Sequence, residues 1–357
     1  MLTYVIRRVL LILPTLLGIT VLVFTVMALS PGGVGASLLT RGGDLRPEER
    51  AAMEAYLNER YGLDDPMPVQ YVRWLNNVSP IGFRTDANGN AAGFGFKDPN
   101  LGMSFAKNRP VTSLIAQALP ITLLLNGLTV PLIFVLSIVM GVYTARFRGK
   151  ALDVGIGTAN LALWSVPTIW MGVLLIGLLA SEEYVKIFPT SGLESLGADR
   201  WTFLPTTTEH GWQRGYLLDV MWHLVLPVIC LTYSGFAFLT KLTRSAVLEN
   251  MLADYARTAR AKGASEHAVL WRHVFRNSLL PLITVAASIL PGLLVGSVIV
   301  ESIFSIDGMG RLVVEAVQMR DREVVLSVTL ITALLTLVSY LIVDICYAAA
   351  DPRVSYE

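Results

Sequence analysis

The fold of this chain depends on residues 241–281, which read KLTRSAVLENMLADYARTARAKGASEHAVLWRHVFRNSLLP. This segment holds seven Lys or Arg residues against three acidic residues, and it lies between two strongly apolar stretches. It is too polar to cross a bilayer, yet its residues favour helix. Gly263 followed by Ser265 predicts that one helix ends and a second helix is capped there. A helix–Gly–helix element at the cytoplasmic face of a membrane is well suited to dock a soluble partner.

The rest of the chain is dominated by apolar residues. Of its 357 residues, 54% are apolar and 15% are charged. Soluble domains carry about 25% charged residues, so most of this chain is expected to lie in lipid. Apolar runs of the roughly 20 residues needed to cross the hydrocarbon core as a helix occur six times. They lie at about 9–29, 114–145, 155–180, 221–240, 282–300 and 326–350.

The charged residues support this division of the chain. All 28 Lys and Arg residues fall outside the six spans, and Asp344 is the one acidic residue inside a span. This is expected because a charge at the centre of a membrane helix costs about 2.5–3.5 kcal/mol. The segments 1–8, 146–154, 241–281 and 351–357 carry 13 basic and 6 acidic residues, against 15 and 20 in the remaining segments between the spans. The first set is therefore predicted to be cytoplasmic, with both termini inside.

The predicted organisation has four parts. They are an N-terminal tail with a retained first transmembrane helix (1–29), an extracytoplasmic region with short amphipathic helices (30–113), a core with five transmembrane helices (114–350) and a cytoplasmic tail (351–357). Within the extracytoplasmic region, one amphipathic helix is expected to begin near Arg46 and end at Gly62. A second apolar-faced helix is expected over 69–75. The Gly-, Asn- and Asp-rich stretch 79–100 predicts an irregular, mobile excursion.

Motifs for chemistry are lacking. Lys150 follows a Gly but has no upstream Gly of a phosphate-binding loop, and Gly308 and Gly310 lack the third Gly of a dinucleotide fingerprint. Cys230 and Cys346 both fall in apolar spans and are expected to pack as small apolar side chains. We therefore expect a chain that is not an enzyme and binds neither a cofactor nor a metal. If ATP drives its function, another subunit must hydrolyse it.

Asp344 leaves two interpretations open. It could be the proton or cation site of an ion-coupled transporter, because ionisable groups inside membranes are commonly functional. Alternatively, it lies near the cytoplasmic end of the last helix, about 10 Å along a helix from Asp351, and snorkels or pairs with inner basic groups. The scarcity of charge in the other spans favours the second interpretation. An ion-coupled transporter or channel, and a membrane receptor without transport, are the alternatives to an ATP-driven machine.

Eight segments together form a recognisable pattern. They are YVIRRVL at 4–10, RYGLDDPMPVQYVRWL at 60–75, SVPTIWMG at 165–172, WHLVLP at 222–227, DYARTARAKGASE at 254–266, RHVFRNSLLP at 272–281, ESIFSIDGMGRL at 301–312 and DPR at 351–353. This pattern resembles the B-type permease subunits of ATP-binding-cassette (ABC) importers for dipeptides, oligopeptides and nickel. The long outer loop and the SIDGMG stretch at 305–310 look closer to the microcin-C/oligopeptide type.

The resemblance implies a fold and a set of partners. The fold would be the all-α, six-helix membrane architecture of type I ABC importer permeases, with a long extracytoplasmic loop after the first helix. The chain would form half of a peptide translocation pathway in the bacterial inner membrane. Its partners would be the lipid bilayer, a homologous C-type permease, two ATPase subunits or one fused ATPase, and an extracytoplasmic solute-binding protein. ATP and Mg would bind to the ATPases, and no nucleic-acid partner is expected.

The resemblance also places the contact with the ATPase. Arg257 to Gly263 occupy the position of a Glu-Ala-Ala-x-x-x-Gly motif, whose first helix docks into a cleft of the ATPase. Arg257 stands for the Glu and Thr258 for the first Ala, whereas Ala259 and Gly263 match. Pro281 lies 18 residues after the Gly, further than in the general motif. The contact residues expected on this basis are Tyr255, Ala256, Arg257, Thr258, Ala259, Arg260, Ala261, Lys262, Gly263 and Ala264.

The side chains of this element suggest how it would meet a partner. Its small residues, Ala256, Ala259 and Ala261, are expected to allow close approach to a groove of the ATPase, and its basic residues to pair with acids there. Residues that contact the transported solute are spread over several spans, and the sequence does not assign them.

Overall fold

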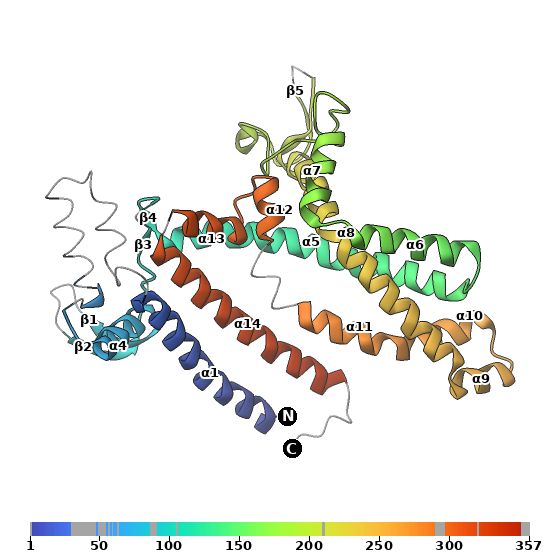
Figure 1. The fold of residues 1–357 in the computed structure, drawn as a ribbon, viewed down its shortest axis with the longest axis horizontal. Helices are drawn as coiled ribbons and strands as arrows, with labels where there is room; N and C mark the ends of the chain where they lie inside the picture. The colour runs from blue at the N-terminus through green and yellow to red at the C-terminus, as the bar shows by residue number, and fades with distance from the viewer. Residues whose placement is uncertain are drawn as a thin grey trace. The chain divides into compact units, whose positions relative to one another are not determined.

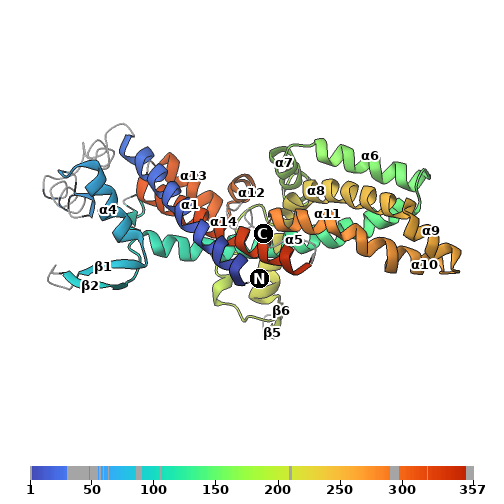
Figure 2. The ribbon, with the colours of Figure 1, turned by 90° about the horizontal axis from the view of Figure 1, so that it is seen from below.

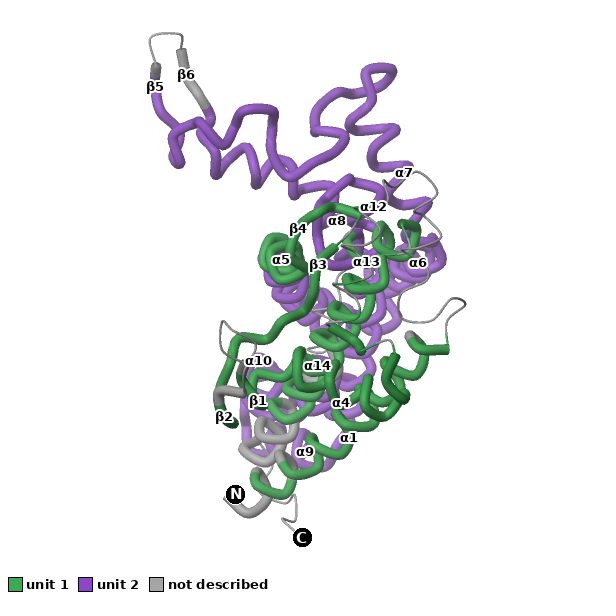
Figure 3. The backbone as a smooth tube through the Cα atoms, turned by 90° about the vertical axis from the view of Figure 1, so that its left-hand side faces the viewer, with its two compact units in different colours: residues 1–117, 312–357 green, residues 118–311 purple. Residues whose placement is uncertain are grey.

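A computed structural model describes residues 2–29, 48, 55, 58, 60–62, 64–85, 91–104, 106–208, 211–289, 297–319 and 321–350. Most of these residues are helical (Figure 1). The chain forms two compact units, one of residues 1–117 with 312–357 and one of residues 118–311 (Figure 3). Each unit is described by itself below.

The first unit contains two long apolar helices. They are α1 (Leu2–Leu29) and α14 (Arg322–Ala350), which lie side by side (Figures 1 and 2). The short helix α4 (Met67–Val78) covers the end of α1: Trp74 is buried, and its ring centroid lies 5.7 Å from that of Phe24. The Thr20 and Tyr71 hydroxyls are hydrogen-bonded at 2.9 Å. The helix predicted over 69–75 is thus confirmed, and it packs on the first long helix.

Two antiparallel hairpins complete this unit. Strand β1 (Ile81–Thr85) pairs with β2 (Ala91–Phe96), and β3 (Met103–Ser104) pairs with β4 (Arg109–Pro110). Phe83 and Phe94 face each other across the first hairpin with ring centroids 5.5 Å apart, and such cross-strand aromatic pairs stabilise a ladder. The irregular excursion predicted for 79–100 is therefore wrong in the described part, because this aromatic pair outweighs the Gly-rich composition.

The second unit is built on the helix α8 (Gly215–Leu252). The other elements with residues in this unit are α5 (Val111–Arg146), α6 (Ala151–Ser165), α7 (Thr168–Leu179), the single-turn helix η2 (Ala198–Arg200), the hairpin of β5 (Thr206–Thr208) and β6 (Gly211–Gln213), α9 (Asp254–Ala261), α10 (Glu266–Ala268), the π-helical turn η3 (Val269–Val274), α11 (Phe275–Ile289), α12 (Val298–Ile303) and α13 (Met309–Gln318). Helices α5 and α13 each also extend into the first unit.

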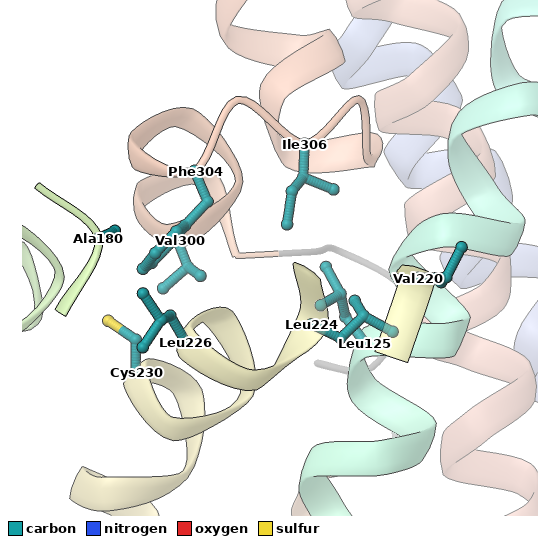
Figure 4. Packing of buried hydrophobic residues seen from close by; sticks show 9 residues of the cluster. All are labelled: Leu125, Ala180, Val220, Leu224, Leu226, Cys230, Val300, Phe304 and Ile306. Carbon is teal, nitrogen blue, oxygen red and sulfur yellow. The ribbon is translucent and has the colours of Figure 1, made fainter. Parts of the chain in front are cut away.

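A buried apolar cluster joins α5, α8 and α12. Figure 4 shows its members, which are Leu125, Ala180, Val220, Leu224, Leu226, Cys230, Val300, Phe304 and Ile306. Cys230 is 1% exposed and packs among these side chains, as predicted for it. The side chains of Cys346 and Asp344 lie outside the described part of the structure.

The predicted span 155–180 is interrupted. Helices α6 and α7 meet at a 99° bend, and the break holds Val166 and Pro167. Pro167 has no backbone N–H to continue the helix, and it disfavours helical geometry at the residue before it. Tyr233 of α8 donates a hydrogen bond to the Val166 carbonyl at 2.6 Å, which satisfies one acceptor at this break.

Among the described residues, three helices are long and apolar enough to cross a membrane. They are α5, α8 and the part of α14 from Arg322 to Ile342, and α6 with α7 would be a fourth if the bent pair is one span. The described apolar part of α1, Leu10–Val26, is shorter. Helix α11 covers only the start of the predicted span 282–300, and 290–296 lie outside the described residues. The count of six spans and their orientation stay predictions.

Candidate coupling site

The cationic segment folds into the helix–Gly–helix element that its sequence predicts. Helix α8 ends at Leu252, and Ala253 adopts an extended conformation that lets the chain turn before α9 begins at Asp254. Helix α9 and the following α10 lie at the end of α8 that is remote from α7 and α12 (Figures 1 and 2). The structure therefore places the element beyond the apolar part of α8, where its charges stay clear of that stretch.

Gly263 ends α9 by a Schellman motif. Its φ is +83°, its N–H donates to the Arg260 carbonyl at 2.9 Å, and the Ala264 N–H donates to the Ala259 carbonyl at 3.1 Å. These two bonds satisfy carbonyls that the helix end leaves free, and the positive φ favours Gly at this position. The Ser265 hydroxyl then accepts a hydrogen bond from the Ala268 N–H at 3.3 Å and caps α10.

The inner face of α9 packs into the chain's own core. Ala256 is fully buried and Ala259 is 8% exposed, in a cluster with side chains from α5, α8 and η3. These partners are Val142, Ala145, Val247, Val269, Leu270 and Val274. The close approach of a partner expected at Ala256 and Ala259 does not fit this burial, because their small side chains serve contact between α9 and the chain's own helices. Ala261 is exposed.

The outer face of α9 is basic and accessible. Tyr255, Arg257, Thr258 and Lys262 are all exposed. Arg257 approaches Asp254 at 3.6 Å, but both side chains are largely exposed, so this pair contributes little to stability. An oppositely charged surface could therefore compete for Arg257 at low cost.

Arg260 is turned toward its own chain instead. Its Nε donates to Glu266 Oε1 at 2.9 Å, and its Nη1 donates to the Met251 carbonyl at 3.3 Å. It thereby ties α9 to the end of α8 and to the start of α10. Of the ten residues expected at the contact, Ala256, Ala259 and Arg260 thus make internal contacts that hold the element in place.

The helices behind the element are hydrogen-bonded to one another. Ser278 of α11 is 1% exposed, and its hydroxyl donates to the Ala246 carbonyl of α8 at 3.2 Å or to the Val274 carbonyl at 2.9 Å. Further along, the Ser137 hydroxyl of α5 donates to the Phe236 carbonyl of α8 at 3.1 Å. Because α9 packs against side chains of α5, α8 and η3, and η3 continues directly into α11, a displacement of α9 would act on all of these helices.

A buried carboxylate organises the segment 297–311 of the second unit. Glu301 is 1% exposed, and its carboxylate accepts hydrogen bonds from Thr122 Oγ1 and Ser297 N, both at 3.2 Å, and from Arg311 N at 2.9 Å. A Cβ atom on Gly308 would lie 2.5 Å from Glu301 Cδ, so only Gly fits against the carboxylate. Burial raises the pKa of Glu301 above its ordinary value, whereas the hydrogen bonds from Arg311 and Thr122 oppose that rise.

Sequence reasoning did not assign this role to Glu301. The stretch 301–312 stands out in the sequence by its two glycines after an acid, but nothing in it points to Thr122, which lies 179 positions earlier. The same holds for Asp219, which is fully buried and accepts hydrogen bonds from the Ser195 N–H at 2.6 Å and hydroxyl at 2.8 Å. His223 is buried beside Asp219, and its Nδ1 lies 2.9 Å from the Asp219 carbonyl oxygen.

Comparisons with known proteins agree with the pattern found in the sequence. Residues 137–356 match the family model of a binding-protein-dependent transport system inner membrane component. Residues 1–126 match the N-terminal model of a binding-protein-dependent transport system membrane component.

Similar proteins cover the chain from end to end. The oligopeptide transport system permease protein AppB of Bacillus subtilis is 36% identical over 356 residues, which is 100% of both chains. The di/tripeptide transport system permease protein DppB of Pseudomonas aeruginosa is 33% identical over 360 residues, again with 100% of both chains covered. The inner membrane ABC transporter permease protein YejB of Escherichia coli O157:H7 is 29% identical over 391 residues, with 99% of each chain covered.

Proposed function

Since the chain belongs to the family of binding-protein-dependent transport system inner membrane components, we propose that it is the B-type permease of an ATP-driven peptide importer. It forms half of the translocation pathway. The peptide substrate is supported by the full-length similarity to proteins named as oligopeptide and di/tripeptide permeases. The protein lies in the bacterial inner membrane. The excess of basic residues in the segments predicted to be cytoplasmic supports a cytoplasmic location of both termini.

The permease works with subunits that supply what this chain lacks. A homologous C-type permease forms the other half of the pathway, and an extracytoplasmic binding protein delivers the peptide. Two ATPase subunits, or one fused ATPase, bind ATP and Mg and hydrolyse the nucleotide. The lack of a phosphate-binding loop in this sequence supports that division of labour.

The ATPase contact is the segment from Tyr255 to Ala264. The observation that carries this proposal is the two-sided construction of α9, whose basic outer face is exposed and whose small inner face is buried among α5, α8 and η3. Exposed cations such as Arg257 and Lys262 can pair with acids of the ATPase, and the buried Ala256 and Ala259 hold α9 to the membrane helices. An ATPase docked on the exposed face of α9 would therefore displace the helices that pack against the buried face of α9.

Movement would follow from ATP-driven closure of the ATPases. Closure displaces α9, and the hydrogen bonds and apolar contacts behind α9 carry that displacement into α8 and α11. Rigid-body shifts of packed helices are a common way for such a displacement to change the access of a central pathway. In this way hydrolysis outside the membrane tilts the spans between outward-facing and inward-facing states.

The test is co-purification with and without charge reversal on the outer face of α9. The double variant Arg257→Glu with Lys262→Glu should lose the ATPases and retain the second permease when a tagged chain is purified in mild detergent. Lys186→Glu is the matched control, because Lys186 is exposed and lies in a segment predicted on the other side of the membrane. ATPase retention by the double variant would show that the contact lies elsewhere. Uptake of labelled peptide by liposomes containing this chain alone would overturn the importer proposal.

A further inference from the structure

A cavity of about 590 Å³ lies in the second unit between α6 and α8, near the end of α5. Asp153, Asn160 and Trp164 line it from α6, and Phe238, Lys241 and Arg244 line it from α8. None of these residues belongs to the proposed contact with the ATPases. The cavity is large enough to hold part of an organic ligand, because small-molecule sites typically measure about 300–1,000 Å³.

The walls of the cavity change from charged to apolar along its length. Helices α6 and α8 run antiparallel, since Arg244 meets Asp153 at one end and Tyr233 meets Val166 at the other. The cations therefore lie at the end where α8 enters the cationic segment. Toward the α6–α7 break the lining side chains are Leu161, Trp164, Ala237 and Phe238. A ligand that fits this gradient has a charged head and an apolar tail.

The charged end of the cavity is suited to an anionic group. Arg244 donates from Nε to Asp153 Oδ1 at 2.6 Å and from Nη2 to Asp153 Oδ2 at 2.7 Å, so these two charges offset each other. Lys241 is exposed, and within the described ranges its ammonium forms no ion pair. The cavity thus keeps one uncompensated positive charge at this end. An anionic group would be attracted there.

Polar groups halfway along the cavity also lack partners. Asn160 is 8% exposed, and its carboxamide makes no hydrogen bond to any described residue. Thr240 is 2% exposed, and its hydroxyl is without a hydrogen-bond partner in the described structure. A buried polar group without a partner costs free energy, so such groups commonly mark a place where another molecule binds.

We propose that this cavity binds an anionic phospholipid of the cytoplasmic leaflet, with its phosphate at Lys241 and an acyl chain against Trp164. Lys241 is the first residue of the cationic segment predicted to be cytoplasmic. It therefore lies at the depth expected for the lipid head groups of the cytoplasmic leaflet. The ester carbonyl groups below the phosphate of a glycerophospholipid can accept hydrogen bonds from the Asn160 carboxamide. Basic pockets between membrane helices on the cytoplasmic side are suited to anionic head groups, and the apolar end of this cavity favours a lipid over a soluble phosphate.

The first test compares lipid head groups by native mass spectrometry of the full-length chain. Delipidated protein is incubated with dioleoyl-phosphatidylglycerol or with dioleoyl-phosphatidylcholine, and retained lipid is counted. The expected result is preferential retention of phosphatidylglycerol, which Lys241→Gln reduces by about five-fold, the effect of one cation near an anionic head group. Lys262→Gln removes the same charge outside the cavity and should not change retention. Equal retention of both lipids, or equal effects of the two variants, would overturn the proposal.

The second test fills the cavity. Gly157 lines it, and a Cβ atom on Gly157 would have no other atom within 4 Å, so Gly157→Leu can enter the space without a backbone clash. Gly155 is equally unobstructed on the same helix but lies outside the lining, which makes Gly155→Leu the matched control. Gly157→Leu should reduce phosphatidylglycerol retention at least five-fold, with melting temperatures of both variants confirming that they fold. Equal retention by the two variants would contradict a lipid in this cavity.

Two further experiments distinguish the lipid from other occupants of the cavity. Inorganic phosphate at millimolar concentration should leave retention unchanged, and displacement of the lipid by phosphate would identify a soluble-anion site instead. Retention is also measured on the complex with the second permease. Loss of the lipid in that complex would mean that a helix of the partner fills the cavity, whereas persistence of the lipid supports the proposal.

Discussion

Gly141 of α5 and Thr243 of α8 approach so closely that a Cβ atom on Gly141 would lie 2.5 Å from the Thr243 Cβ atom and 2.9 Å from the Thr240 carbonyl oxygen. The two helices are therefore in backbone contact near their predicted cytoplasmic ends. Small residues at such positions allow helices in a membrane to pack closely. This contact lies next to the cluster that holds α9, so it belongs to the route by which the proposed coupling element would act on the membrane helices.

Replacement of Gly141 by Ala should force α5 and α8 apart. The expected loss of stability is about 1–3 kcal/mol, the usual cost of adding a methyl group to a well-packed contact. Gly127→Ala on the same helix is the control, because a Cβ atom there has no other atom within 4 Å. It should leave stability unchanged or raise it by up to about 1 kcal/mol through helix propensity. Thermal unfolding of both purified variants in detergent measures the difference, and equal melting temperatures would contradict the close contact.

Replacement of Gly263 tests the end of α9. A Cβ atom at this residue meets no neighbour, so the cost of Gly263→Ala comes only from the positive φ of +83° and should be about 1–2 kcal/mol. Gly263→Asn should cost less, because Asn tolerates this conformation better than Ala. Peptide uptake in reconstituted complexes and the melting temperature of the permease should both follow the order Gly, Asn, Ala. Wild-type behaviour of Gly263→Ala would show that the geometry of this turn is not required.

The Arg244 and Asp153 pair should show strong energetic coupling. Asp153 is 6% exposed, and its carboxylate also accepts a hydrogen bond from the Gly149 N–H at 2.9 Å. Arg244→Gln leaves that buried carboxylate without its cation, which should destabilise the protein by about 3 kcal/mol, the low end for a buried pair because Arg244 is partly exposed. Asp153→Asn combined with Arg244→Gln should cost less than the two single variants together.

The exposed pair of Lys186 and Glu182 is the control for this double-mutant cycle, because solvent screens it and no measurable coupling is expected. Melting temperatures of the four proteins in each cycle provide the measurement. Additive effects of the Asp153 and Arg244 substitutions would mean that the two side chains do not interact in the membrane-embedded protein.

Glu301→Gln should disturb the segment 297–311. Both carboxylate oxygens accept hydrogen bonds, so the amide group of Gln would place N–H donors against a donor such as Arg311 N or Ser297 N. The expected cost is about 1–3 kcal/mol, the price of leaving buried donors unpaired. Asp307→Asn is the control: Asp307 pairs with Arg311 at 3.0 Å, but its side chain is 82% exposed, so little change is expected. Limited proteolysis and thermal unfolding measure the stability of both variants. A Glu301→Gln variant as stable as the unsubstituted protein would contradict the role assigned to the carboxylate.

Features that depend on neighbouring residues can be predicted from the amino acids alone. The exclusion of all Lys and Arg residues from the apolar runs placed most of the chain in a membrane, because a charge in lipid is costly wherever it occurs. Gly263 and Ser265 marked the end of α9 and the start of α10, because helix caps act within a few residues. The eight short segments identify the family without any knowledge of the contacts, and the family comparisons confirm it.

The contacts between residues far apart in the chain become known from the three-dimensional structure. It paired Asp153 with Arg244 across 91 positions and Glu301 with Thr122 across 179, and it turned Ala256 and Ala259 inward where the sequence suggested contact with a partner. It also made a hairpin of a Gly-rich stretch, because Phe83 and Phe94 pair across the strands. Hydrophobicity, charge and capping are encoded locally. The identity of a partner depends instead on the rotation and register with which helices pack, and these are set by the whole core at once.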